Sequence, residues 1–260
     1  MLRHIILDFM KQKKVKYSIY FKDLKSGCQC SIDEKVVVPS ASIIKLFIMA
    51  KAFETCNSGR WKLNDKVTVE GKNRVPYSIV YLLDESNSYT ILDLITLMIV
   101  QSDNSATNKL IDMLGMGDIN DYISQLGFKD TLLQRKMMDM DAKEKGLENY
   151  TSAQDVGKFL KMLYDGQIIN KHYSDMMLDI MKEQLDSSMM RIDIPDDIVV
   201  AHKTGDLTNI KHDAGIVFTD KESYIFVMLT WDALSDNYAR NAIGSVSKLV
   251  YNYVDNMGEK

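Results

Sequence analysis

The sequence contains few cysteines, and the three that it has form no disulfide framework. Cys28 and Cys30 stand two residues apart, so in a strand they would share a face without bridging easily, and Cys56 is isolated. An odd number of cysteines without regular spacing indicates free thiols. A zinc site at Cys28 and Cys30 would need further ligands, which the four scattered histidines do not supply. We therefore expect no metal ion and no organic cofactor.

The sequence also lacks any block of five like charges and any apolar run close to the ~20 residues of a membrane span. Its 32 basic and 36 acidic side chains nearly balance, at a net charge of −4, so we expect no nucleic-acid or anionic-membrane partner. Asp8 interrupts the apolar N-terminal segment, and no small-residue cleavage site follows, which predicts a cytoplasmic protein without an export signal. A mature chain trimmed of its leader would look the same and would be secreted.

Strand-like and helical segments are unevenly distributed along the 260 residues. Helical periodicity dominates from 90 to 185, whereas β-prone segments occur near both ends, at 17–21, 36–38, 197–201, 214–218 and 223–230. This pattern predicts an α+β fold: an αβα sandwich with a mainly antiparallel sheet built from both termini, and an inserted all-helical subdomain. Residues 1–40 and 186–260 would form the sandwich and residues 41–185 the helical subdomain, with a cleft between them. Helices at 1–14 and 237–257 would cover one face of the sheet.

A serine and a lysine open the first long apolar segment. Ser42-Ile43-Ile44-Lys45 precedes five apolar residues at 46–50, so the two polar side chains lie about one turn apart at the start of a buried helix. A lysine amine at that distance can act on the serine proton and so activate a nucleophile. The motif alone is weak, because Ser245-Val246-Ser247-Lys248 repeats it, and Ser42 could instead be a helix N-cap.

Two further motifs follow in ascending order. Ser102-Asp103-Asn104 stands at a junction of two helices, although a second Ser-Asp-Asn occurs at 235–237, and Lys203-Thr204-Gly205 begins where the strand at 197–201 gives way to a second strand pair. This series resembles the S-x-x-K, S-D-N and K-T-G motifs of class A serine β-lactamases and penicillin-binding proteins. The segment 97–112 resembles the helix–SDN–helix part of that family, and the resemblance covers roughly the whole chain.

The resemblance implies a role for each residue of the first two motifs. Ser42 would be the acylated nucleophile, Lys45 its base or electrostatic partner, and Ser102 the donor of a proton to the leaving lactam nitrogen. Asn104 would bind the substrate's side-chain amide, and Asp103 would brace the turn from inside.

The third motif would bind the rest of the substrate, again by resemblance. Its carboxylate would be held by Lys203 and Thr204, and Gly205 would let the backbone of that strand come close to the ligand. The backbone N–H groups of Ser42 and Asp206 would form the oxyanion hole.

Two positions outside the motifs have an open assignment. His212 lies where family members carry an arginine for the substrate carboxylate, and a histidine there would add pH dependence, but an ordinary strand or loop position is an equal alternative. Tyr77 is expected at the cleft rim in contact with substrate, with simple packing as the alternative.

The pattern departs from the family in the long loop before the Thr151 helix start. The loop glutamate that activates the deacylating water in class A enzymes falls on Met137 here, and a methionine cannot accept a proton. Asp139, Asp141 or Glu144 would have to take over that role. Loss of a general base typically costs ~10²–10⁴-fold in rate, so the sequence predicts ready acylation and slow turnover.

Three functions remain open at this stage. The first is a class A-type serine β-lactamase with slow deacylation, and the second is a D-Ala-D-Ala peptidase or esterase on the same fold. The third is a non-turnover penicillin-binding or sensor module. In each case the expected ligand is a small molecule, either a β-lactam or an acyl-D-Ala-D-Ala-like compound. We expect the protein to be a monomer.

Overall fold

The computed structural model describes residues 1–257, and this part of the chain forms two compact units. The first, here the sheet unit, contains residues 1–43, residues 151–162 and the chain from Asp186 onward. The second, here the helical unit, contains residues 44–150 and 163–185. Along residues 1–257 we find no helix with the length and apolar character needed to cross a bilayer.

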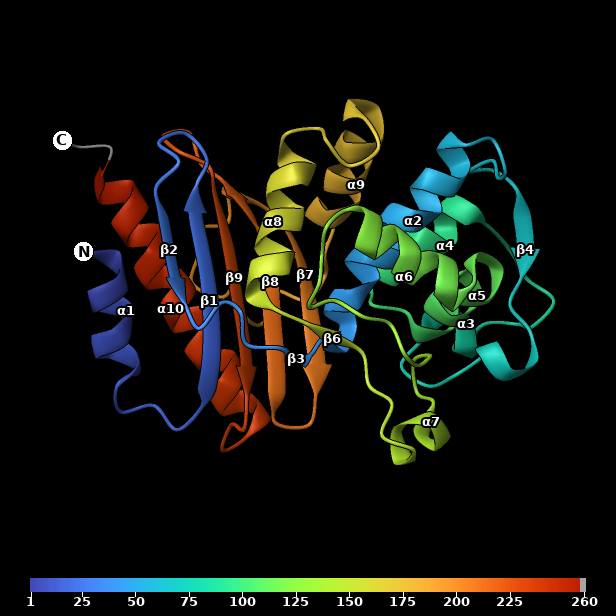
Figure 1. The fold of residues 1–260 in the computed structure, drawn as a ribbon, viewed down its shortest axis with the longest axis horizontal. Coiled ribbons are helices and arrows are strands. Elements are labelled where there is room, and N and C mark those ends of the chain that lie inside the picture. Colours follow the sequence, from blue (N-terminus) through green and yellow to red (C-terminus); the bar gives the residue numbers. More distant parts are fainter. Residues whose placement is uncertain (258–260) are drawn as a thin grey trace. The chain divides into compact units, whose positions relative to one another are not determined.

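The sheet unit is built on a five-stranded antiparallel sheet with the order β2-β1-β9-β8-β7 (Figure 1). Its strands come from the two ends of the chain, as the sequence predicts, and are β1 (Lys16–Asp23), β2 (Gln29–Ile32), β7 (Val199–Leu207), β8 (Ile210–Phe218) and β9 (Tyr224–Trp231). The central strands β8 and β9 are almost continuously buried. Strands covered on both faces read as apolar runs rather than as alternating patterns, which is why these segments were recognisable in the sequence.

Helices α1 (Leu2–Met10) and α10 (Asp236–Met257) lie side by side on one face of this sheet (Figure 1). In α1 the buried residues recur every fourth position, at Leu2, Ile6 and Met10, so they form one apolar stripe. Ile6 and Ile243 are fully buried in the same core cluster. Complete burial of each such side chain contributes about 1.5–3 kcal/mol.

Helix α8 (Ala153–Tyr164) begins on the opposite face of the sheet, because Gly157 permits close contact with β1. A Cβ atom on Gly157 would lie 2.2 Å from the Tyr20 ring. Ile19 and Phe21 of β1 point into the core under α1 and α10. Tyr20 lies between them in the strand, so its side chain points to the opposite face of the sheet. Residues 151–162 thus group with the sheet unit, although they fall inside the 41–185 range predicted as helical subdomain.

The helical unit is arranged around one buried helix, α2 (Lys45–Asn57), in which all but one residue are buried from Lys45 to Cys56. Helix α4 begins with the predicted capping box, in which Thr90 and Asp93 each bond the other's backbone N–H. The remaining elements of this unit are β4 (Lys66–Thr68), η2 (Gly71–Asn73), α3 (Ile79–Leu82), β5 (Ser88–Thr90), α4 (Ile91–Val100), α5 (Asn104–Leu114), α6 (Met116–Gln125), α7 (Met140–Glu144) and α9 (Lys171–Lys182).

The second strand of the first hairpin lies earlier in the chain than predicted. The partner of β1 is β2 at Gln29–Ile32, and residues 36–38 contribute only to the short β3 (Val38–Pro39). The reason is a tight turn: Asp23 Oδ1 accepts bonds from the Lys25 and Ser26 amides at 3.1 and 2.6 Å, and Gly27 takes a φ of +74°. The chain therefore reverses within a few residues.

Strand β7 is also longer than the predicted 197–201 segment. It pairs with β8 without interruption from Val199 opposite Phe218 to Leu207 opposite Ile210. A two-residue turn closes this hairpin, with Asn209 at a φ of +59°, a conformation that asparagine tolerates. The Lys203-Thr204-Gly205 motif therefore lies inside a strand and not at its end.

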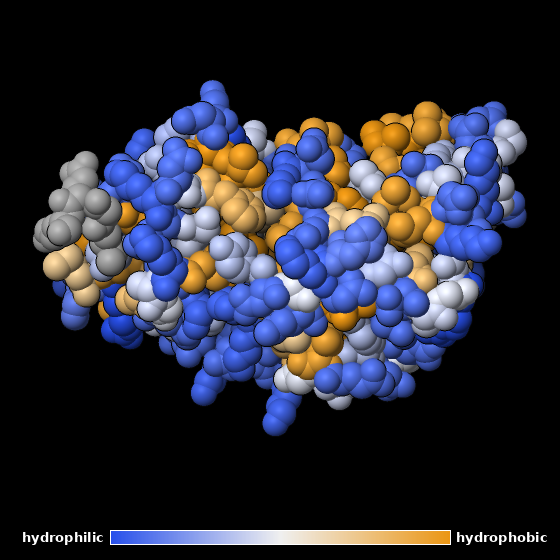
Figure 2. All heavy atoms as spheres, turned by 90° about the horizontal axis from the view of Figure 1, so that it is seen from above, coloured by the Kyte–Doolittle hydropathy of each residue, from blue (hydrophilic) through white to orange (hydrophobic). Residues whose placement is uncertain are grey.

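The face of the molecule drawn in Figure 2 is mainly hydrophilic. Figure 2 shows one face on which charged and polar residues predominate and apolar side chains form separate patches. Most large apolar side chains are in the two cores, and the most exposed exceptions besides Met1 are Tyr77, Leu82, Leu185 and Leu234. Scattered exposure of this kind is normal for a folded protein.

Candidate active site

The Lys45 amine occupies a fully buried position among oxygen atoms of the Ser102-Asp103-Asn104 motif. Its Nζ donates to the Ser102 carbonyl oxygen at 2.7 Å, to Ser102 Oγ at 3.1 Å and to Asn104 Oδ1 at 2.9 Å. Three acceptors around one ammonium compensate for the water it loses on burial. The structure therefore brings three of the predicted site residues together within the helical unit.

Asp103 fixes the turn that presents these groups. It is fully buried and caps α5, with Oδ1 accepting from the Ala106 amide at 2.8 Å and from Ser78 Oγ at 2.7 Å. Its Oδ2 accepts from the Val80 amide at 3.0 Å. The prediction that Asp103 braces the turn from inside is confirmed. Because the Asp103 carboxylate accepts bonds from three donors, it fixes the Ser102-Asp103-Asn104 turn and the segment around Ser78 relative to each other.

Tyr77 lies in that same segment with 80% of its surface exposed. Its carbonyl oxygen accepts from the Asn104 amide at 3.3 Å, and the neighbouring Pro76 carbonyl accepts from Asn104 Nδ2 at 3.2 Å. The Tyr77 backbone is thus tied to the Ser102-Asp103-Asn104 turn while its ring points into solvent. Its packing alternative is excluded by this exposure, and substrate contact stays a prediction.

Two predicted site residues and one neighbour of a predicted site residue adopt left-handed backbone conformations. Ala41, Tyr77 and Ser102 have φ values of +46°, +56° and +55°. Each costs on the order of 1 kcal/mol for a residue with a Cβ atom. Backbone strain of this type concentrates at functional sites, where the surrounding structure maintains it.

Ser42 lies half-buried in a 3₁₀ turn, η1 (Ala41–Ile44), which runs directly into α2, whose first residue is Lys45. The N-cap position of α2 is Ile44, so Ser42 is not the N-cap of that helix. The capping alternative for Ser42 is therefore not realised.

The Lys203 side chain is fully buried in β7 of the sheet unit. Its Nζ donates to the Thr204 carbonyl at 2.8 Å. Burial lowers the pKa of Lys203 to about 7, against the opposing influence of the Asp213 and Asp186 carboxylates. A lysine with this pKa is only partly protonated near neutral pH. A bound anion would favour the ammonium form of Lys203, and the ammonium in turn would bind the anion more strongly.

Gly205 permits the segment before Ser42 to approach the sheet. A Cβ atom at this position would lie 3.2 Å from Ala41 Cβ and 3.1 Å from His212 Cβ. These distances are tighter than ordinary contacts, so a larger residue would displace one neighbour. Gly205 thus allows a close approach within the sheet unit, toward the chain that carries Ser42, and the close approach of its strand to a substrate stays a prediction.

His212 anchors the same segment from the neighbouring strand. It is fully buried, with Nε2 2.8 Å from the Pro39 carbonyl and Nδ1 2.7 Å from the Lys211 carbonyl. The Thr230 amide also donates to Nδ1 at 3.1 Å. Burial lowers the pKa of His212 to about 4, so the ring is neutral at pH 7.

These contacts match the ordinary strand position that was the alternative for His212. The ring is bonded to backbone groups on both sides and stays neutral over the physiological range. The predicted pH dependence near neutrality therefore does not arise from His212.

The Asp206 carboxylate holds its strand position through two cations that the sequence did not indicate directly. Lys211, fully buried on β8, donates to Asp206 Oδ1 at 2.6 Å and lies 3.0 Å from Asp236 Oδ2. Arg240 of α10 pairs with the other Asp206 oxygen. The available signal was the hairpin register, which puts Asp206 opposite Lys211 once the two-residue turn is recognised.

The loop at 129–150 is closed by a buried ion pair at its neck. The Arg135 guanidinium makes two bonds to the Glu148 carboxylate, at 2.9 and 3.0 Å, with Arg135 buried and Glu148 mostly buried. Asn149 Oδ1 accepts the amides of Gln134 and Arg135, which joins the two ends of the loop a second time. A loop of this length is thus ordered by its own contacts.

Met137 is held in this loop by its backbone. Asn108 of α5 accepts the Met137 amide at 2.8 Å and donates to the Met137 carbonyl at 3.0 Å, and the Met137 side chain is buried. The Asn108 side chain thus satisfies both the N–H and the C=O group of Met137. The backbone of Met137, which occupies the position predicted for the glutamate, is therefore held in place.

The acidic residues proposed as replacement bases are engaged elsewhere or exposed. Asp139 is the N-cap of α7 and accepts the Ala142 amide at 3.0 Å. Asp141 and Glu144 lie on that short helix, and Glu144 is exposed, as is Asp141.

A family model described as "Beta-lactamase enzyme family" matches residues 1–254. The chain belongs to this family. Membership supports a hydrolase of the β-lactamase type, in agreement with the resemblance drawn from the three motifs.

Individual relatives are distant. An imipenem-hydrolyzing beta-lactamase of Enterobacter cloacae is 26% identical over 194 residues, which cover 73% of this chain and 66% of that enzyme. The alignment therefore spans just under two thirds of the relative's length.

Solved structures match over nearly the full chain. PBP-A is 27% identical with a TM-score of 0.91, covering 98% of this chain and 96% of that one, and a mutant of PBP-A was solved as an acyl-enzyme complex with penicillin G. A class A beta-lactamase from Bacteroides cellulosilyticus DSM 14838 is 22% identical with a TM-score of 0.89, covering 98% and 97%. The fold is therefore that of the β-lactamases and penicillin-binding proteins.

Proposed function

We propose that the protein opens β-lactam rings through a covalent acyl-enzyme on Ser42 and releases the product slowly. The observation that carries the proposal is the Lys45 amine, buried and bonded to both the carbonyl and the hydroxyl of Ser102. A buried lysine bonded to a serine hydroxyl is suited to moving protons during acyl transfer.

In the proposed acylation, Ser42 Oγ forms a bond to the lactam carbonyl carbon while its proton passes to the neutral Lys45 amine. The tetrahedral intermediate then collapses, the C–N bond breaks, and Ser102 Oγ gives its proton to the leaving nitrogen and takes one from Lys45, to which it is bonded. If Lys45 is an ammonium from the start, it stabilises the developing charge, and the Ser42 proton passes to Ser102 Oγ as Ser102 gives its own proton to the nitrogen. The backbone N–H groups of Ser42 and Asp206 would bind the carbonyl oxyanion.

Recognition of the substrate carboxylate falls to Lys203 and Thr204. Both are buried in β7, and the strand position of Asp206 next to them is maintained by Lys211 and Arg240. A carboxylate close to Lys203 would favour its ammonium form and so raise a pKa that is about 7 without ligand.

Slow deacylation is supported by the chemistry of Met137. Its thioether cannot take a proton from a water molecule, and its backbone is held by Asn108. Asp139, the nearest acidic residue in sequence, is bonded to the Ala142 amide. Loss of a general base costs ~10²–10⁴-fold, so the acyl-enzyme should accumulate.

Intact-protein mass spectrometry after mixing with penicillin G tests the proposal. We expect a mass increase of one penicillin that persists for many minutes, together with slow nitrocefin hydrolysis, and neither signal in Ser42→Ala. Fast hydrolysis without a detectable adduct would overturn slow deacylation. An adduct that survives in Ser42→Ala would overturn the assignment of the nucleophile.

A penicillin-binding module without turnover is the second candidate, favoured by Met137 and by the likeness to PBP-A. The two candidates differ in the fate of the adduct. Recovery of unmodified protein and hydrolysed penicillin over hours supports the slow hydrolase, whereas an adduct that decays only with unfolding supports the binding module. Cleavage of an acyl-D-Ala-D-Ala peptide under the same conditions would indicate a peptidase.

A further inference from the structure

Three of the 17 methionines stand close together in the loop at 129–150. Met137 occupies the predicted glutamate position and is buried, whereas Met138 and Met140 have 36% and 52% of their surface exposed. Among the methionine side chains that the structure describes, only Met1 is exposed besides these two. The loop therefore presents two accessible thioethers next to a buried one.

Residues 138–147, here the loop tip, are held mainly by their own turn. Helix α7 inside the tip contains no buried residue, and in Figure 1 it stands apart from the other helices of the helical unit. The hydrogen bonds that the structure shows for residues 140–147 stay within the tip, as does the bond from the Leu147 amide to the Ala142 carbonyl at 3.1 Å. The tip therefore depends on few contacts with the rest of the unit.

The two methionines supply much of the apolar contact that the tip makes. Most of the Met138 surface and about half of the Met140 surface are covered, and Leu147, which is 39% exposed, is the other large apolar side chain of the tip. A methionine sulfoxide is polar, and covering a polar group that lacks a bonding partner is unfavourable. Oxidation of these thioethers therefore weakens the contacts that hold the tip.

The segment before the tip is held more firmly. Asn120 exchanges two hydrogen bonds with the Leu133 backbone, both of 2.8 Å, and Asn108 makes two with the Met137 backbone. Local opening of a folded chain takes place where such contacts are few. An opening that begins in the tip should therefore stop before Met137.

Hydrogen peroxide oxidises a thioether in one step of two electrons. A sulfur lone pair attacks one peroxide oxygen, the O–O bond breaks, and the departing hydroxide takes the proton of the transferred oxygen and leaves as water. The sulfur is oxidised to the sulfoxide, and the peroxide is reduced to water. Because accessible thioethers react first, Met138 and Met140 should be oxidised before the buried Met137.

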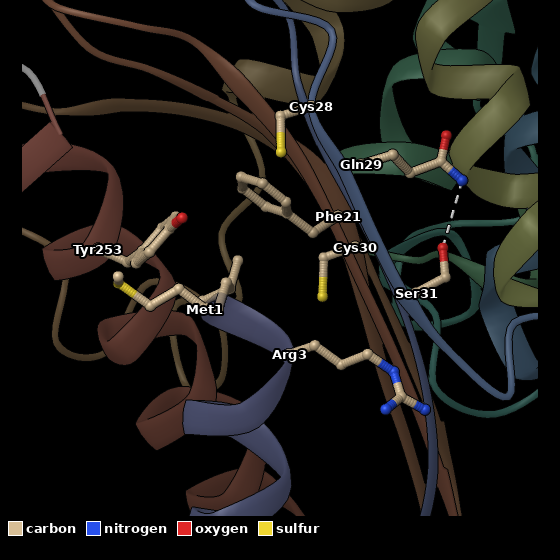
Figure 3. Close-up of a pocket in the computed structure, with 9 residues that line it drawn as sticks. Met1, Arg3, Phe21, Cys28, Gln29, Cys30, Ser31 and Tyr253 are labelled. Atoms are coloured by element: carbon tan, nitrogen blue, oxygen red, sulfur yellow. Dashed lines mark hydrogen bonds between the residues drawn. The ribbon is translucent and has the colours of Figure 1, made fainter.

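Two cysteines are competing targets for peroxide. Cys28 and Cys30 line a pocket of about 200 Å³ in the sheet unit, where α1 and α10 meet β2 (Figure 3). Burial raises the pKa of the Cys30 thiol, which disfavours the thiolate that peroxide oxidises. A thiol reductant reverses cysteine sulfenic acids and disulfides but not methionine sulfoxide, so the two kinds of oxidation can be separated.

We propose that Met138 and Met140 form a peroxide-reactive site whose oxidation opens the loop tip and leaves Met137 and the firmly held segment in place. A methionine sulfoxide reductase converts the sulfoxide back to the thioether, so the opening is reversible. The loop that carries the residue in the predicted glutamate position thereby responds to peroxide.

Peptide mapping by mass spectrometry after graded treatment of the full chain with hydrogen peroxide tests the selectivity of the site. We expect one added oxygen on each of Met138 and Met140 before any on Met137 or on the half-buried Met116 of α6. Oxidation of Met137 or Met116 at the same rate as the two tip residues would overturn the assignment of the site.

Limited digestion with trypsin, after removal of peroxide and treatment with dithiothreitol, tests the opening. Lys143 and Lys145 are exposed at α7, but a protease cuts them only when the chain opens locally. Oxidation should speed cleavage at these two lysines by roughly 10-fold, because cleavage follows the population of the open form. The reductase should restore the slow rate. Unchanged cleavage of protein that is fully oxidised at Met138 and Met140 would overturn the proposal.

A double variant, Met138→Leu with Met140→Leu, keeps the side-chain volume and cannot form a sulfoxide. Its cleavage at Lys143 and Lys145 should be equally slow before and after peroxide. Met116→Leu is the matched control and should show the full acceleration of the wild type. Acceleration that persists in the double variant would assign the effect to another oxidised residue and contradict the proposal.

Discussion

The Nε2 atom of His212 lies 2.8 Å from the carbonyl oxygen of Pro39, three residues before Ser42. This bond joins the strand that faces Gly205 to the segment that leads into the proposed nucleophile. A histidine predicted as a candidate for substrate binding is therefore a positioning residue.

The buried His212 ring should make stability depend on mildly acidic pH. The unfolded chain takes up a proton here near pH 6.5, whereas the folded chain does so only near pH 4. The unfolded state therefore binds more protons in this interval, and stability falls as the pH drops from 6.5 toward 4, by up to about 3 kcal/mol. Urea unfolding between about pH 4.5 and 7.5 measures this. His212→Gln keeps a donor for Pro39 and does not titrate, so its stability should vary less, and equal slopes in both proteins would contradict the assignment.

Gly205→Ala should slow acylation of Ser42 by a few-fold to about 10-fold, because the added Cβ shifts a neighbour by a few tenths of an ångström, and a shift of about 1 Å near reacting groups costs roughly 10²-fold. The added Cβ would lie 3.2 Å from Ala41 Cβ and must move either that segment or His212. Stopped-flow measurement of nitrocefin acylation tests this. Gly117→Ala in α6, where a Cβ meets nothing within 4 Å, serves as control and should leave the rate unchanged. Equal rates for Gly205→Ala and the wild type would count against a tight contact at this position.

Lys203 should give acylation by anionic penicillins a pH dependence near neutrality. Its pKa of about 7 means that the ammonium, the form that attracts a carboxylate, is lost as the pH rises through 7. The second-order acylation constant should then fall, up to about 10-fold per pH unit above that pKa. Lys203→Arg stays charged throughout this range, so its profile should be flat there. A wild-type profile that stays level well into the alkaline range would show that the lysine keeps its proton.

Met137→Glu should increase the deacylation rate by roughly 10²–10³-fold, since it places a carboxylate where the family resemblance expects the general base. Acylation should change little. Decay of the penicillin adduct, followed by mass spectrometry, measures the effect. Met140→Glu adds the same charge on the exposed helix α7 and should not accelerate decay. If Met137→Glu and Met140→Glu accelerate deacylation equally, the added negative charge explains the effect, and a carboxylate at position 137 does not act as the general base.

Local patterns predicted the parts of the structure that local forces determine. The capping box at Thr90 and the brace at Asp103 follow from side chains bonding backbone groups three residues away. The sheet from both termini follows from apolar runs too short for helices. Each of these depends on neighbours in sequence.

Long-range partners could not be predicted in the same way. Asn108 holds Met137 across 29 residues, and Arg240 reaches Asp206 across 34. Nothing in the spacing of a single sequence marks such pairs. The placement of residues 151–162 was missed for the same reason, because it depends on the fit between Gly157 and Tyr20.

Of the three oxygen atoms bonded to Lys45 in the Ser102-Asp103-Asn104 turn, two belong to amide or peptide carbonyls and can only accept. The Ser102 hydroxyl is the one partner among these three that can also donate. If Lys45 gives up a proton, the neutral amine has two hydrogens for these three oxygens, and among them only the Ser102 O–H can turn to the nitrogen lone pair. Among these three contacts, the one to the Ser102 hydroxyl is thus the only one whose donor and acceptor can exchange roles, whereas the contacts to the Ser102 carbonyl and to Asn104 Oδ1 run in one direction only.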